Sequence, residues 1–200
     1  MLQYIVSGEN GVEIVGTVEA ALNNSCRWIR LDLSCLSSTE RERVATIETV
    51  SRLCKNSDAI LSIENDIELY KQLKVDGIHV ADESMSLVDI RKELGEEPIM
   101  GLTIKEASQV PFLPRTAIDY VEIDKSVDDI KVHNEIVRQF RDAGIEEPVV
   151  AHFENTPTLE MLHNCGADGI ALDSKTVSPD VLVDLINGLE RLNQERIDSL

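Results

Sequence analysis

The stretch Val75-Asp76-Gly77-Ile78-His79-Val80 decides the fold, because its pattern returns twice along the chain. Ala167-Asp168-Gly169-Ile170-Ala171-Leu172 repeats it closely, and Ile118-Asp119-Tyr120-Val121-Glu122-Ile123 repeats it more loosely. The three aspartates lie 43 and 49 residues apart. One strand-plus-helix unit takes roughly 20–30 residues, so each interval holds two units and the three stretches are alternate strands of one series.

Short apolar runs alternate with amphipathic segments along the whole chain and predict eight strands with helices between them. The expected strands are 2–6, 28–33, 59–63, 75–80, 98–102, 120–123, 148–151 and 169–172. Strict alternation of this kind is typical of a (β/α)8 TIM barrel, and 200 residues fit one such domain over residues 1–200. The alternative is an open doubly wound sheet, but no Gly-x-Gly-x-x-Gly follows the first strand.

Helix starts are expected where a capping side chain precedes an apolar stripe. The predicted caps are Thr17, the Thr39–Glu42 capping box, Thr156 with Pro157 behind it, and Ser178 with Pro179 behind it. The fifth helix is expected to be irregular, because Pro111 and Pro114 fall inside it and an interior proline costs about 3 kcal/mol. Only a short helix around Lys105–Gln109 is predicted there.

The formal net charge of −18 argues against a partner that is a nucleic acid or an anionic membrane surface. No apolar run approaches the ~20 residues of a membrane span, and the first residues already form a strand rather than a signal peptide. A cytoplasmic protein is therefore expected. Its four cysteines, Cys26, Cys35, Cys54 and Cys165, lack metal spacing and are predicted to be buried reduced thiols.

Functional residues of TIM barrels lie at the carboxyl ends of the strands. Polar residues at these ends, in strand order, are Arg30 and Asp32, then Glu64, Asn65 and Asp66, then His79 and Asp82, then Thr103, Glu122, His152 and Ser174. Arg30 and Asp32 share one strand face, since side chains alternate along a strand. A salt bridge between them inside the barrel is expected, because charges that face inward must be paired.

Five segments, in order over nearly the whole chain, resemble the thiamine phosphate synthase/TenI family: LSIEND at 61–66, VDGIHV at 75–80, MGLT at 100–103, PVVA at 148–151 and GADGIA at 166–171. The resemblance implies a TIM barrel transferase of thiamine biosynthesis. The family enzyme joins a pyrimidine diphosphate to a thiazole phosphate and releases diphosphate, whose charge Mg²⁺ and cations hold. It thus implies Mg²⁺, no organic cofactor, a small phosphorylated metabolite as partner and, as is common in the family, a homodimer.

The same resemblance implies a set of site residues. Carried over by position, the catalytic residues are Arg30, His79 and Thr103. The residues that bind phosphate or ligand are Asp32, Glu64, Asn65, His152 and Ser174; the magnesium ligands are expected to be Asp66 and Asp82, which lie near the aligned positions rather than on them. Oxygen ligands of this kind suit Mg²⁺.

The chain departs from the family pattern at several of these positions. Ser84 stands where the second magnesium aspartate is expected, His152-Phe153 replaces a glycine pair whose amides take phosphate, and the threonine- and lysine-rich loop after the sixth strand is missing. The histidine that TenI-type chemistry needs after that strand is absent too. These departures favour an alternative: a non-catalytic or repurposed relative that binds a small metabolite or a protein partner. A third hypothesis is isomerisation by the carboxylates of Glu64, Asp82 or Glu122.

Overall fold

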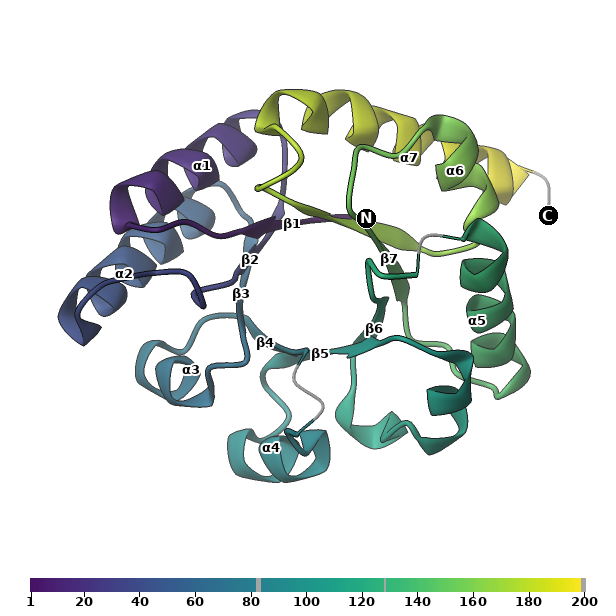
Figure 1. Ribbon diagram of the computed structural model, residues 1–200, viewed down its shortest axis with the longest axis horizontal. Coiled ribbons are helices and arrows are strands. Elements are labelled where there is room, and N and C mark those ends of the chain that lie inside the picture. Colours follow the sequence, from purple (N-terminus) through teal and green to yellow (C-terminus); the bar gives the residue numbers. More distant parts are fainter. Residues whose placement is uncertain (82–83, 128, 199–200) are drawn as a thin grey trace.

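The computed structural model describes residues 1–81, 84–127 and 129–198 and contains one closed ring of parallel strands (Figure 1). The strands are β1 (Leu2–Val6), β2 (Trp28–Leu31), β3 (Ile60–Glu64), β4 (Gly77–Val80), β5 (Ile99–Ile104), β6 (Tyr120–Ile123), β7 (Val149–Phe153) and β8 (Gly169–Asp173). Each strand pairs in parallel with the next, and β8 pairs with β1. The predicted TIM barrel is confirmed, and the open-sheet alternative is wrong.

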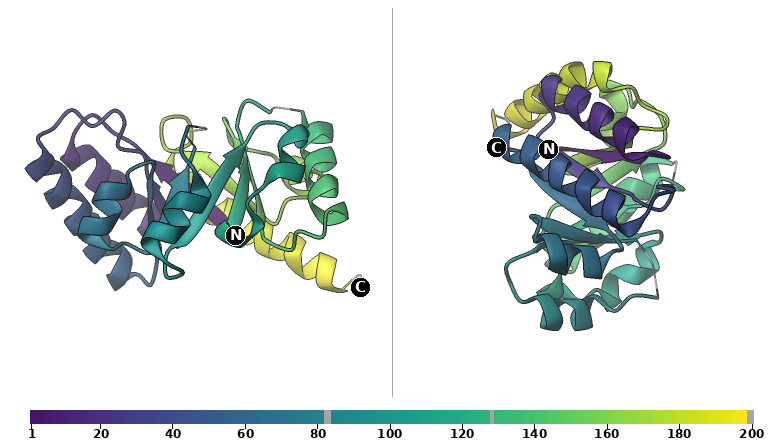
Figure 2. Two further views of the ribbon diagram at one scale, coloured as in Figure 1. Left: turned by 90° about the horizontal axis from the view of Figure 1, so that it is seen from below. Right: turned by 90° about the vertical axis from the view of Figure 1, so that its left-hand side faces the viewer.

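Helices cover the outside of the ring in both views of Figure 2. They are α1 (Gly11–Asn23), α2 (Glu40–Asn56), α3 (Ile67–Leu73), α4 (Leu87–Leu94), α5 (Ile130–Asp142), α6 (Leu159–Asn164) and α7 (Leu182–Asp198), with short 3-10 helices η1 (Ala107–Phe112), η2 (Arg115–Ala117) and η3 (Pro179–Val181). Among the helices that the structure describes, none is long and apolar enough to cross a membrane. The start of β1 and the last turns of α7 lie toward the same end of the barrel axis.

Two of the predicted helix starts are wrong. Helix α1 begins at Gly11, six residues before Thr17, and the Asn10 side chain caps it by accepting from the Glu13 amide. Helix α6 is capped by Thr158 rather than Thr156, so Pro157 precedes the cap. Asn and Thr are both good caps, so sequence preference alone does not choose between neighbouring candidates.

The other two caps and the irregular fifth unit are confirmed. Thr39 and Glu42 form the capping box of α2, and Ser178 caps η3 at Pro179. No full helix joins β5 to β6; η1 and η2 stand there instead, and Pro111 lies inside η1.

The repeated aspartates link neighbouring strands. Each one precedes an even-numbered strand, and its Oδ2 accepts from the backbone amide at or next to the start of the strand before it. The bonds are Asp76 to Leu61 N (2.8 Å), Asp119 to Met100 N (2.7 Å) and Asp168 to Val149 N (2.8 Å). Arg91 and Arg141 also donate to Asp119 and Asp168, each at 2.6 Å. The repeat that predicts the fold therefore marks a structural bond.

The barrel interior has two layers of side chains. The lower layer, nearer the starts of the strands, is mainly apolar, and the upper layer, nearer their carboxyl ends, is polar. Ile5, Trp28, Tyr120, Val150 and Ala171 form one small buried cluster, distinct from the large core between strands and helices. The next inward positions along the strands are polar, since side chains alternate in direction. Space for the Tyr120 ring comes from Gly101, where a Cβ atom would lie 2.1 Å from the ring carbon Cζ. Most of the buried polar side chains inside the ring therefore lie toward the end where the strands finish.

Candidate functional site

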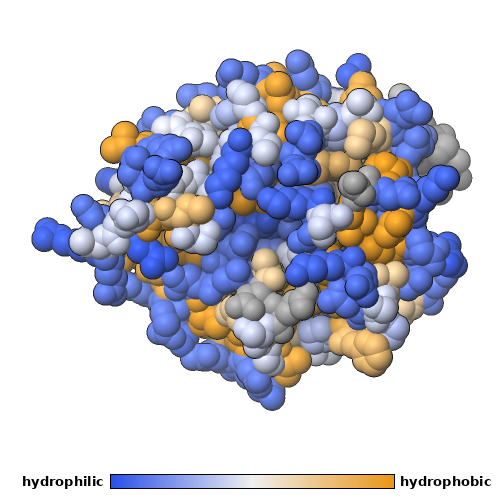
Figure 3. Space-filling model, viewed as in Figure 1, coloured by the Kyte–Doolittle hydropathy of each residue, from blue (hydrophilic) through white to orange (hydrophobic). Residues whose placement is uncertain are grey.

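Six residues, one from each of the strands β2 to β7, meet inside the barrel at the end where the strands finish. Arg30, Glu64, His79, Thr103, Glu122 and His152 are joined by the contacts described below, and five of them are buried, while Glu64 is partly exposed. Seen down the barrel, the centre of the ring carries hydrophilic residues (Figure 3). The sequence analysis predicted five of the six as site residues.

Arg30 lies at the centre of the cluster and is paired twice. Its Nη1 and Nη2 donate to the two carboxylate oxygens of Glu122 at 2.7 and 3.1 Å, across the lumen from β2 to β6. Glu64 Oε2 lies 3.1 Å from Nε in an ion-pair contact. The expected salt bridge to Asp32 is wrong: β2 ends at Leu31, and Asp32 instead accepts from the Ser34 amide. Bidentate pairing fixes both side chains.

The two carboxylates beside Arg30 have opposite pKa shifts. Burial alone would raise the pKa of Glu122, but Arg30, with His79 and His152, outweighs it and holds that pKa well below its usual range. For Glu64, burial dominates over the attraction of Arg30, and the nearby charges of Asp32 and Glu122 add to it, so its pKa is raised. The cluster of one guanidinium and two carboxylates is thus net negative when both are ionised.

His79 is held as a neutral imidazole. Its Nε2 is 2.7 Å from Thr103 Oγ1, which itself donates to Glu122 Oε1 at 3.4 Å, so the threonine oxygen must accept from Nε2–H. Nδ1 is then the acceptor from the Tyr120 hydroxyl, also at 2.7 Å. Burial, and then the charge of Arg30, lower the pKa of His79 well below its ordinary value. A neutral imidazole that bridges two hydroxyls can relay a proton.

Sequence reasoning missed two residues of this network. Tyr120 bonds His79, and Gln3 Nε2 donates to the Tyr120 oxygen at 3.1 Å. Both lie below the carboxyl ends of the strands, where the site residues were expected. Strand alternation was the available signal, because it places Tyr120 on the same face of β6 as Glu122. Glu122 was recognised as a polar residue at a strand end, but only the isomerisation hypothesis gave it a functional role.

His152 at the end of β7 is 7% exposed and adjoins the same carboxylate. Its Nδ1 lies 3.3 Å from Glu122 Oε1, and its Nε2 has no hydrogen-bond partner in the described part of the chain. Facing a carboxylate, Nδ1 carries the proton. Nε2 is therefore the free acceptor of this ring.

Asp32, Glu64, Asn65 and Asp66 line one small cleft of about 260 Å³ at the mouth. Asp66 accepts from the Leu69 amide, which caps α3, and its other oxygen is 3.1 Å from Arg43. The side chain of Asn65 accepts from the Ala81 amide. Asp82 lies outside the described residues. Within the ranges that the structure describes, no three His, Cys, Asp or Glu side chains gather as a metal site.

The end of β8 is held by local bonds. Ser174 Oγ accepts from the Ser7 amide at 3.2 Å, which ties β8 to β1. Asp173 lies 3.5 Å from Lys125, and Lys175 Nζ lies 3.4 Å from the Cys35 thiol. Cys35 is exposed, so the expectation of a buried thiol is wrong for this cysteine, whereas Cys26, Cys54 and Cys165 are buried. None of the four cysteines, all of which lie in the described ranges, forms a disulfide.

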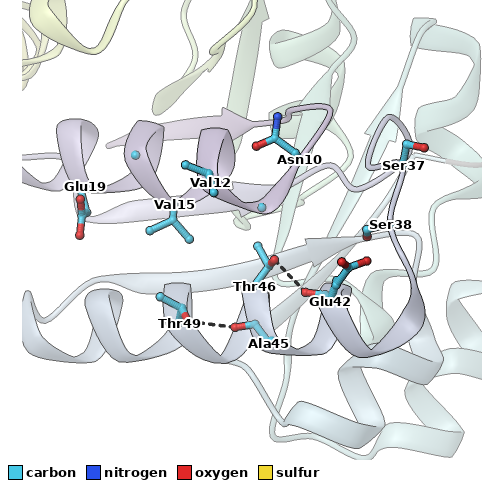
Figure 4. Close-up of a pocket in the computed structure, with 12 residues that line it drawn as sticks. Asn10, Val12, Val15, Glu19, Ser37, Ser38, Glu42, Ala45, Thr46 and Thr49 are labelled. Atoms are coloured by element: carbon cyan, nitrogen blue, oxygen red, sulfur yellow. Dashed lines mark hydrogen bonds between the residues drawn. The ribbon is translucent and has the colours of Figure 1, made fainter.

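Two further clefts bear on the choice of site. One of about 480 Å³ adjoins Thr103 and is lined by apolar residues of the β4 and β5 ends and η1, including Met85, Leu102 and the 85% exposed Phe112. Another of about 690 Å³ lies between α1 and α2, on the outside of the barrel (Figure 4). The outer cleft lacks the buried titratable groups of the mouth. The chemistry of the side chains, rather than cavity size, identifies the mouth as the candidate site.

Comparisons with known proteins agree with this architecture. The family model "Thiamine monophosphate synthase" matches residues 3–176. A thiamine-phosphate synthase of Bacteroides fragilis is 30% identical over 195 residues, covering 90% of this chain and 93% of that one. One of Bacteroides thetaiotaomicron is 31% identical over 183 residues, covering 86% and 87%.

Solved structures extend the likeness to the fold. The thiamine phosphate pyrophosphorylase of Pyrococcus furiosus superimposes with a TM-score of 0.76 at 18% identity, over 96% of each chain. At such identity the likeness shows the fold alone. Since the family model spans most of the sequence and the barrel is shared, this chain belongs to the thiamine monophosphate synthase/TenI family.

Proposed function

We propose that the chain is a transferase that joins a pyrimidine diphosphate to a thiazole phosphate and releases diphosphate. The observation that carries the proposal is the family match over residues 3–176. The relatives that share about 30% of their residues with it are named thiamine-phosphate synthase. The proposal includes a small phosphorylated metabolite as substrate, a cytoplasmic location and a homodimer.

In this proposal the upper lumen performs the chemistry. Arg30, His79 and Thr103 are the catalytic residues. Diphosphate gains charge as it leaves, so a positive charge near it lowers the barrier. Arg30 is the cation of the lumen and stays protonated, because Glu122 and Glu64 outweigh the effect of burial on its pKa and raise it. Neutral His79 fixes the Thr103 hydroxyl through its Nε2–H.

Ligand binding is assigned to the rim around that lumen. Asp32, Glu64 and Asn65 line the small cleft, His152 offers a free Nε2, and Ser174 lies at the end of β8. The cleft contains oxygen donors of the kind that Mg²⁺ prefers. Asp66 and Asp82 are the proposed holders of that ion, which when bound would neutralise the diphosphate oxygens.

The direct test is release of diphosphate. Purified protein with both phosphorylated substrates and Mg²⁺ should release diphosphate, and omission of either substrate should abolish the signal. Thr103→Val should lower the rate about 10²-fold, because it removes a hydroxyl from the lumen while keeping the shape. Thr49→Val is the matched control, since Thr49 lines the cleft between α1 and α2 on the outside of the barrel. No diphosphate above the protein-free rate would contradict the proposal.

One observation favours the second candidate, a relative that binds without catalysing. Two N–H edges of the Arg30 guanidinium contact carboxylates, so a diphosphate that bound Arg30 directly would have to displace a buried ion pair. This candidate predicts no change in melting temperature with diphosphate and Mg²⁺. A ligand at about 100 times its Kd would add roughly 2.7 kcal/mol of stability, so a rise of several degrees would exclude it.

A further inference from the structure

A second cleft opens at the other end of the barrel, where the strands begin. It has a volume of about 500 Å³. Its lining includes Leu2, Trp28, Ile60, Ile99, Tyr120 and Ile186, and we name it the lower cleft. Ile186 belongs to α7, whose last turns reach this end of the axis (Figure 2). Small-molecule sites in proteins are typically apolar concavities of about 300–1,000 Å³, so the size and lining fit one.

Two aromatic side chains, Trp28 and Tyr120, form the part of the lower cleft that we call its floor. Trp28 and Tyr120 pack edge to face, with ring centroids 4.8 Å apart and planes at 75°. The position of the Tyr120 ring is fixed by its hydroxyl group, which donates a hydrogen bond to His79 Nδ1 and accepts one from Gln3 Nε2. The floor is thus rigid, and a flat ring that enters the cleft meets a surface that is already formed.

Among the buried side-chain nitrogen and oxygen atoms of this lining that the structure describes, only the Trp28 indole nitrogen has no hydrogen-bond partner. The indole nitrogen of Trp28 is buried and has no hydrogen-bond acceptor in the described part of the chain, although the residue is only 8% exposed. Indole N–H is a donor only and usually finds an acceptor when buried. An acceptor on a ligand would supply what the protein does not.

The charges around the lower cleft are of both signs, since the Met1 ammonium group and Arg27 lie in its lining together with Asp119 and Glu190. Arg27 donates to the carbonyl oxygens of Leu22 and Cys26 at 3.0 and 2.8 Å, so its guanidinium is engaged. Asp119 is paired with Arg91. The carboxylate of Glu190 is exposed in the lining, on a chain of formal charge −18. The lining therefore offers no excess of positive charge that would select a phosphorylated metabolite, which the mouth is proposed to take.

We infer that the lower cleft is a binding site for a neutral, mainly apolar ring compound that carries one hydrogen-bond acceptor. The ring packs on Trp28 and Tyr120, and the acceptor takes the indole N–H. The site is independent of the proposed transferase reaction, since it lies at the opposite end of the barrel from the mouth. Occupation is expected to stabilise the folded protein by linkage.

Two isosteric probes test this inference. 4′-Fluoroacetophenone has a carbonyl acceptor, and 4-fluoro-α-methylstyrene has a methylene group in its place. Trp28 is the only tryptophan, so its indole N–H gives one NMR signal. The ketone should shift that signal saturably, and ¹⁹F NMR should show the styrene binding about tenfold more weakly.

Three variants separate the lower cleft from the rest of the surface. Trp28→Phe should bring the two ¹⁹F affinities together, because the donor is gone while the ring remains. Ile186→Phe should abolish binding of the ketone by filling the cleft. Asn187→Phe, at the next and exposed position of α7 outside the lining, should leave it unchanged.

Linear, non-saturating shifts, equal affinities of the two probes for the unmodified protein, or full ketone binding by Ile186→Phe would each overturn the inference. Diphosphate with Mg²⁺ should neither compete with the ketone nor move the indole signal. A failure of the diphosphate-release assay would therefore leave this result standing, and a failure here would leave the transferase proposal standing.

Discussion

Glu122 is the residue on which the buried polar cluster depends. One of its oxygens accepts from Arg30 at 2.7 Å, and the other receives Arg30 and Thr103 and lies near both imidazoles. A buried ion pair gains little over apolar packing when both partners are present, but removal of one partner leaves a buried charge without compensation. The cluster is therefore sensitive to single substitutions.

Glu122→Gln should lower the free energy of unfolding by about 3–5 kcal/mol, because Arg30 then remains charged and buried beside a neutral amide. Urea unfolding measures this directly. Glu135→Gln is the control, since Glu135 pairs with Arg138 on the exposed face of α5 and its loss should change stability little. Equal effects of the two substitutions would show that the Arg30–Glu122 pair is not buried as described.

Stability should fall as the pH drops below about 6.5, the ordinary pKa of histidine, because His79 stays neutral in the folded protein. Burial lowers its folded pKa, so below that pH the unfolded chain binds a proton that the folded chain does not. His79→Gln, which can still bond Tyr120 and Thr103, should flatten the curve by up to about 1.4 kcal/mol per pH unit. Urea midpoints between pH 7 and pH 5 give the comparison. Parallel curves for the two proteins would contradict a neutral His79.

The residues of the site were predictable because strand ends can be read from the sequence. Arg30, Glu64, His79, Thr103 and His152 all follow from the period of two and from where each apolar run stops. Their partners were not predictable. Arg30 reaches Glu122 across the lumen, and that choice depends on the tilt and closure of the ring rather than on neighbours in sequence.

At the level of elements, the types and order of strands and helices were predicted well, and their starts less so. Strands β1 and β6 match the predicted ranges, because each has an apolar pattern with clear limits. Helix α1 was predicted too short, since Gly11 and Gly16 weaken its first turns on propensity. Packing against the barrel outweighs that cost.

The two candidate caps of α1 offer a matched pair of substitutions. Asn10→Ala should cost about 1 kcal/mol, because the Glu13 amide loses its acceptor. Thr17→Ala should be neutral or slightly stabilising, since Thr17 lies inside the helix and alanine has the higher helix propensity. Thermal unfolding of both variants decides. If Thr17→Ala lost more stability than Asn10→Ala, the helix would begin at Thr17, as the sequence predicted, and not at Gly11.

Over the whole molecule, much of the positive charge serves the fold. Arg91 and Arg141 hold the strand-linking aspartates, and Arg30 is enclosed by carboxylates. The chain has 19 basic and 37 acidic side chains, so cations are in the minority, and these three arginines are already engaged by carboxylates. The sequence indicates this shortage through its charge, but only the structure shows which arginines are already paired.

The central claim is that a closed barrel of eight strands presents its family site at the end where Arg30 and Glu122 meet. A crystal structure of the protein soaked with diphosphate and Mg²⁺ tests it most directly. The account predicts a closed ring, a bidentate Arg30–Glu122 contact and diphosphate density at the mouth, within hydrogen-bond distance of His152 or Ser174. An open sheet, or diphosphate bound away from the carboxyl ends of the strands, would contradict it.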